Sequence, residues 1–163
     1  MKPGSIKVAQ HEGVFVIKME GDVRLTLCLS FDSFIESMFS QSDFKSVVFD
    51  LTDAEAIDST TLGLMAKISI NGKAKQFDDP IVISRNPSIT RLLVTMGFED
   101  IFQIVRDADI ALGGELPLEI EQEDADENAV RDKVLEAHRT LMNLNENNKI
   151  TFKELVQSLE EQQ

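Results

Sequence analysis

The sequence predicts an α/β domain, a small mixed and mostly parallel sheet backed by helices, followed by a C-terminal helical hairpin. Apolar strand-like runs alternate with segments whose apolar residues recur every three or four positions, the pattern of strands joined by helices. Residues 1–114 hold 16 acids and 11 bases, a net charge of −5, whereas residues 115–163 hold 13 acids and 5 bases, a net charge of −8. We therefore divide the chain into a domain at 1–114, an acidic linker at 115–127 and a hairpin at 128–163.

The domain begins with two strands and a helix. Residues 6–10 and 14–19 are strand-like and flank a glycine-containing turn, which predicts a β-hairpin. Apolar residues between positions 31 and 39 then repeat at helical spacing and form one stripe. A near-continuous apolar run at 46–51 predicts a strand that is covered on both faces.

The second half of the domain continues this alternation. Its expected elements, in order, are a helix at 59–75, a strand at 80–84, a helix at 86–97, a strand at 102–105 and a short helix at 107–112. Parallel strands joined by helices are connected by right-handed crossovers. The order of elements therefore predicts a sheet with helices packed against it.

The C-terminal part carries an acidic stretch followed by two helical patterns. Residues 115–127 contain seven acids and no base, which is typical of a solvated linker. Beyond it, four apolar residues recur at helical spacing, namely Val130, Val134, Leu141 and Leu144. The predicted hairpin is too short to be stable alone. We expect it to pack on the α/β domain, on another copy of the chain, or on another protein.

The composition excludes several classes of function. The net charge of −13 disfavours binding to nucleic acid or to an anionic membrane. No run approaches the ~20 apolar residues needed to span a bilayer, and the N-terminus has no apolar signal segment. The single cysteine, Cys28, lies between two leucines and is expected to be a core residue. A cytoplasmic protein is therefore expected.

The sequence gives little support for a catalytic site, a cofactor site or a metal site. His11 and His138 have no cysteine or second histidine nearby in the sequence, so we assign structural roles to both and expect no metal. No glycine-rich phosphate loop is present, so no cofactor and no enzymatic activity are expected.

One polar segment leaves an alternative open. Five residues have the spacing of calcium ligands in an EF-hand loop, namely Asn143, Asn145, Asn147, Thr151 and Glu154. Only one of them is a carboxylate, and the position that needs glycine holds Asn148. The favoured interpretation is a polar turn in which Thr151 and Glu154 form a capping box for the last helix. A calcium-responsive tail is the alternative, which a calcium titration would test.

The chemistry is expected at Asp58 and Ser59, where a loop meets the start of a helix. Free backbone N–H groups and the positive end of the helix dipole would tolerate a phosphoryl group on Ser59. Such a group would change the surrounding surface by a charge of about −2. The plain alternative is that Asp58 or Ser59 is only an N-cap.

The pattern in this region resembles the STAS-domain family, and more narrowly the bacterial anti-sigma factor antagonists. The matching residues are Phe49-Asp50-Leu51, a short loop, and then Ile57-Asp58-Ser59-Thr60-Thr61-Leu62-Gly63. Further similarities lie at Gly21-Asp22 and in the segment from Leu93 to Phe98. The resemblance covers about residues 5–112.

The resemblance implies a phosphorylation switch. In that family, a partner that is both a serine kinase and an anti-sigma factor phosphorylates the serine after the aspartate, here Ser59. The unphosphorylated antagonist binds this partner, and a serine phosphatase restores that state. A response regulator that carries kinase and phosphatase modules is a further expected partner. The expected contact surface comprises Asp58, Ser59, Thr60, Thr61 and Leu64. The alternative is a STAS adaptor that is never phosphorylated.

Overall fold

The computed structural model describes residues 2–108, 118–124 and 126–162. Most of the short helix expected at 107–112 lies outside these residues. The described strands are β1 Ser5–His11, β2 Val14–Val23, β3 Ser46–Asp50, β4 Ala54–Ile57, β5 Ile81–Ile83, β6 Gln103–Val105 and β7 Leu118–Ile120. The α-helices are α1 Cys28–Ser40, α2 Ser59–Ala74, α3 Pro87–Thr95, α4 Glu127–Met142 and α5 Glu146–Glu161, and two short 3-10 helices are η1 Leu25–Leu27 and η2 Phe98–Asp100.

The strands form one mixed sheet in the order β6-β5-β3-β2-β1-β7, and β4 pairs with the end of β2. β1 and β2 form the expected antiparallel hairpin, while β2, β3, β5 and β6 are parallel neighbours. β7 pairs antiparallel with β1. The predicted α/β class with a mostly parallel sheet is confirmed.

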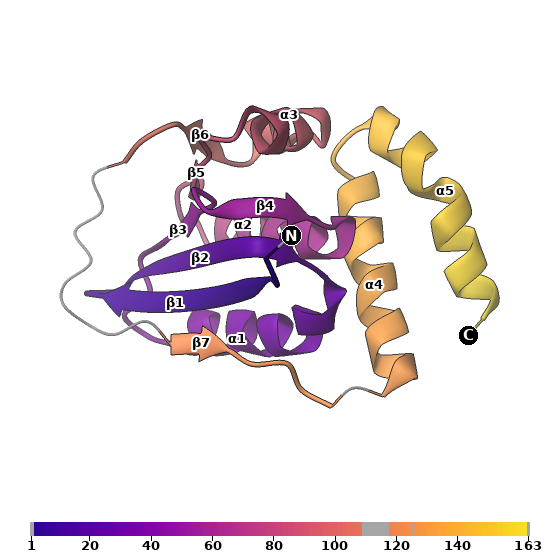
Figure 1. Ribbon diagram of the computed structural model, residues 1–163, viewed down its shortest axis with the longest axis horizontal. Helices are drawn as coiled ribbons and strands as arrows, with labels where there is room; N and C mark the ends of the chain where they lie inside the picture. The colour runs from indigo at the N-terminus through magenta and orange to yellow at the C-terminus, as the bar shows by residue number, and fades with distance from the viewer. Residues whose placement is uncertain (1, 109–117, 125, 163) are drawn as a thin grey trace.

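The core lies between the sheet and helices α1 and α2, which lie behind the sheet in Figure 1. Side chains alternate along a strand, so Phe15 and Ile17 face this core while Val16 faces the other side of the sheet. Val16 forms a smaller buried cluster with Val48 and Ile83. Cys28 is 2% exposed and belongs to the main core, as expected.

Two strands depart from the sequence-based expectation. The residues of β4 were expected to be part of a loop, but they pair in parallel with β2 after a register shift at Gly21 and Asp22. β7 lies within the segment expected to be a solvated linker. Its Ile120 is buried against the core, whereas Leu118 remains 65% exposed.

The C-terminal hairpin folds back onto its own chain. α4 packs across α2 and α1 at the end of the sheet opposite the β1–β2 turn, and α5 lies outside α4 (Figure 1). Of the four residues in the predicted apolar stripe, Leu141 is fully buried and the other three are partly buried. None of the helices in the described ranges is long and apolar enough to cross a membrane.

Candidate functional site

The site begins where β4 ends and α2 starts. Asp58 is the N-cap of α2, and its Oδ1 accepts a hydrogen bond of 2.9 Å from the N–H of Thr61. Its Oδ2 accepts a second bond of 2.6 Å from the N–H of Leu25, which ties η1 to the helix start. Ser59 is therefore the first residue of α2, and the expected helix start is confirmed.

Ser59 forms a hydrogen bond with a residue of the hairpin. Its Oγ lies 2.7 Å from Nε2 of His138, which is on α4. The other ring nitrogen, Nδ1, lies 2.7 Å from the carbonyl oxygen of Val134. Because a carbonyl can only accept, Nδ1 carries the proton and Nε2 is the acceptor for the Ser59 hydroxyl.

His138 is buried in the neutral form. The residue is 2% exposed, and the ring of Phe152 on α5 lies against it with the two centroids 5.0 Å apart. Burial lowers the pKa of His138 below its ordinary value, and the bond to Val134 and the charge of Asp58 oppose this only in part. A neutral imidazole is the state that can accept from Ser59.

Helices α2 and α4 touch at Gly63. A Cβ atom on Gly63 would collide with the carbonyl group and the Cβ of Ala137 on α4. Glycine on one helix and alanine on the other therefore bring the two backbones close together. This approach places His138, the next residue of α4, over Ser59.

A cluster of four charged side chains joins α1, α2 and α4 beside this contact. Lys67 lies 2.8 Å from Asp32 and from Glu136, and Lys133 lies 2.7 Å from the same two carboxylates. Burial alone would raise the pKa of Asp32, but the hydrogen bonds from the two lysines outweigh it and lower that pKa. The cluster therefore stays ionised, with two positive and two negative charges.

The residues expected to contact a partner are largely covered. Thr60 and Thr61 are each 2% exposed and Leu64 is 0% exposed, whereas Asp58 and Ser59 are half-buried. The expected contact surface remains a prediction, and three of its five members, Thr60, Thr61 and Leu64, are not exposed.

His138 is the site residue that the sequence analysis missed. We assigned it an isolated structural role, but it is a direct partner of Ser59 across 79 positions of sequence. Its helical spacing indicates only which face of α4 it occupies. No local signal in the sequence connects that face to Ser59.

Within the described residues, His138 is not bonded to a carboxylate as the histidine of a Ser-His-Asp arrangement would be. In such an arrangement a carboxylate orients the histidine through Nδ1. Here Nδ1 donates to the backbone of its own helix, and both oxygens of the neighbouring Asp58 accept from backbone N–H groups. The pair is therefore built as a contact between α2 and α4.

The turn between α4 and α5 also differs from expectation. Asn145, and not Thr151, caps α5, and its Oδ1 accepts from the N–H of Asn148 at 2.8 Å. Thr151 lies inside the helix and donates to the carbonyl of Asn147. The prediction of a capping box is therefore wrong. Most of the residues with EF-hand spacing lie within helix α5, so they do not form an EF-hand loop.

Asn148 anchors the hairpin to the domain. Its buried Nδ2 donates to the carbonyls of Met96, after α3, and of Leu141, on α4, both at 2.9 Å. This side chain therefore connects both helices of the hairpin to the end of α3.

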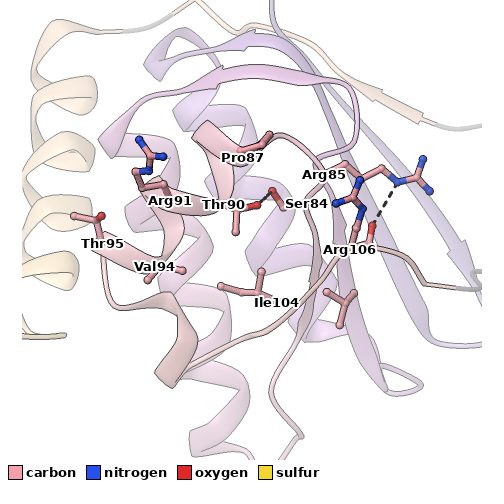
Figure 2. A pocket seen from close by; sticks show the side chains of 10 residues that line it. Ser84, Arg85, Pro87, Thr90, Arg91, Val94, Thr95, Ile104 and Arg106 are labelled. Carbon is pink, nitrogen blue, oxygen red and sulfur yellow. Dashed lines mark hydrogen bonds between the residues drawn. The ribbon is translucent and has the colours of Figure 1, made fainter.

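A second concave region lies between α3 and the edge strand β6. Figure 2 shows this groove, which has a volume of about 510 Å³ and carries three arginines on its walls, Arg85, Arg91 and Arg106. Arg85 donates to the carbonyl of Arg106 and pairs with the carboxylate of Asp107. None of the predicted site residues lines this groove.

Comparison with known proteins identifies the domain around this site. Residues 5–111 match the STAS domain, which is about two thirds of the chain and includes Asp58 and Ser59. A comparison with curated protein sequences found no significant match. The helices α4 and α5 follow the matched segment and lie outside it. The chain belongs to the STAS-domain family.

Proposed function

We propose that this protein is an anti-sigma factor antagonist of a bacterial partner-switching pathway. Unphosphorylated, it binds an anti-sigma factor that is also a serine kinase, and phosphorylation of Ser59 releases it. A serine phosphatase reverses the modification, and both partners are cytoplasmic. The single observation that carries this proposal is the position of Ser59 as the first residue of α2, directly after the capping Asp58, within a STAS domain.

The helix start suits a phosphoryl group chemically. The first backbone N–H groups of a helix and its dipole favour negative charge, so the modified α2 tolerates the new group. A partner surface that buries the same position must desolvate a charge of about −2, at a cost of several kcal/mol. Because about 1.4 kcal/mol changes affinity tenfold, this cost is sufficient for a switch.

The second candidate is a STAS adaptor that is never phosphorylated. The direct hydrogen bond between Ser59 and His138 favours it, because the hydroxyl then has a structural role within the chain.

A response regulator carrying kinase and phosphatase modules remains a proposed partner of the switch. Assembly of copies through the hairpin also stays a prediction, which light scattering would test.

The test uses the full chain and three variants. Incubation with the candidate kinase and ATP should add one phosphate to the wild-type protein and none to Ser59→Ala, measured by intact mass. Ser59→Ala should retain binding to the kinase, while Ser59→Asp should weaken binding at least tenfold in calorimetry. Ser88→Ala is the matched control, because Ser88 is an exposed serine in the first turn of α3. Equal phosphate incorporation into Ser59→Ala would contradict the proposal.

A further inference from the structure

We infer that the face of α1 and α2 around Ser59 is a docking groove for a helix, that α4 is its resident and displaceable occupant, and that a phosphoryl group on Ser59 excludes α4. In the unphosphorylated chain, a partner binds by displacing α4 and placing a helix of its own where α4 now lies. The inference rests on the proposed function only in taking Ser59 as the residue that is phosphorylated. The groove and its occupant come from the contacts between α4 and the domain.

The first step is that the closed arrangement depends on the hydroxyl that a phosphoryl group would replace. The Ser59 hydroxyl donates directly to the buried Nε2 of His138 at 2.7 Å. Phosphorylation replaces that donated proton with phosphorus and three oxygens. Gly63 and Ala137 already bring the two helix backbones close together, one turn along α2. We therefore expect a phosphoryl group on Ser59 to remove the bond to His138 and to push α4 away from α2.

The second step is that the charged cluster divides into two neutral pairs when the helices separate. Lys67 pairs with Asp32 between α2 and α1, so the domain side keeps one ion pair of its own. Lys133 pairs with Glu136 three residues later on α4, so the hairpin side also keeps one. Opening the contact therefore leaves no unpaired charge from this cluster on either side.

The third step is that the hairpin can leave and return. Residues 121–124 are exposed and irregular, and they connect α4 to β7, which is paired with β1. The docked hairpin also leaves two buried polar atoms unsatisfied. The buried Nε of Arg131 and Oδ1 of Asn148 have no hydrogen-bond partner among the described residues. Such atoms reduce the free energy gained on docking.

The side chains that α4 presents to the domain indicate what kind of partner helix would fit in its place. At the closest approach α4 presents the small Ala137 to Gly63. One turn earlier it presents Lys133 to Asp32, and between these two positions it presents Glu136 to Lys67. We therefore expect the partner to present a helix with a small residue at the crossing point. A basic and an acidic residue should lie three positions apart beside it.

Hydrogen exchange of a phosphorylated full-length chain tests the exclusion directly. Ser59→phosphoserine, introduced during synthesis, needs no kinase. We expect backbone amides in α4 to exchange at least tenfold faster than in the unmodified protein. Ser158→phosphoserine is the matched control, because Ser158 is exposed on α5 and gains the same charge without touching Ser59. Unchanged α4 exchange in the Ser59→phosphoserine protein would overturn the inference.

A second experiment tests the groove itself. In the full chain, Ala137→Leu places a bulky side chain against Gly63 and should release α4 while leaving the domain face unchanged. A fluorescent peptide of residues 126–144 with the native sequence should then bind at least tenfold more tightly to this variant than to wild type. Ala129→Leu makes the same substitution at a half-buried position of α4 and should behave like wild type. Equal peptide binding to all three proteins would overturn the helix-docking surface.

The two proposals fail in different ways. If the candidate kinase leaves Ser59 unmodified while phosphoserine still speeds exchange in α4, the proposed function fails and the groove stands. If the kinase modifies Ser59 while α4 exchange is unchanged, the function stands and the exclusion by α4 fails.

Discussion

The STAS domain and the C-terminal hairpin are stabilised by different kinds of contact. The largest fully buried side chains of the domain are aromatic and aliphatic, including Phe15, Phe49 and Phe98, each at most 2% exposed. On α4 the small Ala137 and the polar His138 are buried at the contact with α2, beside the apolar Leu135 and Leu141. The domain therefore depends on apolar burial, whereas much of this contact depends on close approach, hydrogen bonds and ion pairs.

This difference indicates which part of the molecule can move. An apolar core loses its contacts together, because interiors are close-packed and cavities are costly. Individual hydrogen bonds and part-exposed ion pairs contribute only about 1 kcal/mol each, because water replaces them. We therefore expect the hairpin to separate at a lower cost than unfolding the domain, and the domain to stay folded when it does.

The largest effect is expected in the domain core. Phe49→Ala should lower the free energy of unfolding by about 3–5 kcal/mol, because Phe49 is 0% exposed and packs edge-on against Phe102. Urea denaturation followed by circular dichroism measures this change. Val94→Ala is the control, since Val94 is 43% exposed and should change stability by less than about 0.5 kcal/mol. Similar losses for both variants would contradict the assignment of the core.

The next largest effect is expected at the apolar end of the hairpin. Leu141→Ala removes a 0% exposed side chain and should destabilise docking by about 2–4 kcal/mol. Amides of α4 and α5 should exchange much faster, while those of β2 and β3 change little. Leu155→Ala, at a 40% exposed position of α5, is the control. Equal acceleration in the sheet would show that the hairpin and the domain unfold as one unit, which would break the comparison.

A smaller and asymmetric effect is expected in the charged cluster. Asp32→Asn leaves Lys67 and Lys133 with Glu136 alone and should cost about 2 kcal/mol. Lys133→Met leaves the Asp32–Lys67 pair intact and should cost about 1 kcal/mol or less. Urea denaturation of both single variants and the double variant gives the coupling energy. Equal costs would contradict the view that each side is neutral alone.

The smallest effect is expected from pH, through His138. Its pKa is lowered in the folded chain, so the unfolded or undocked state binds a proton first as the pH falls below the ordinary value of 6.5. Docking should therefore be fully favourable above pH 6.5 and weaken progressively below it. Hydrogen exchange of α4 between pH 7 and pH 5, corrected for the intrinsic rate, measures this change. His138→Gln should lose this pH dependence; if it does not, another group is responsible.

Most elements of the domain could be predicted because they depend on local features of the sequence. The stripe at 31–39 predicted α1, and the start of α2 at Ser59 was predicted because polar, cap-forming residues precede an apolar helix there. β4 was missed because Ala54–Ile57 is short and contains two alanines. It is a strand only because the end of β2 offers a parallel neighbour.

The C-terminal region shows where local patterns mislead. Thr151 and Glu154 have the spacing of a capping box, but the cap of the helix is Asn145, six residues before Thr151. The cap is the bond from the N–H of Asn148 to Asn145, and the buried side chain of Asn148 holds this turn against Met96 and Leu141. β7 formed within an acidic stretch because the edge of β1 was available.

The sequence by itself determined the alternation of strands and helices and the position of Ser59 behind its capping aspartate. These follow from periodicity and from contacts within a few residues. Only the tertiary structure decided that the hairpin returns to its own domain and that His138 meets Ser59. That contact joins residues 79 positions apart and depends on how two helix surfaces fit at Gly63 and Ala137. A helical pattern specifies which face of a helix is buried, but the partner of that face is chosen by the shape and charge of a distant surface.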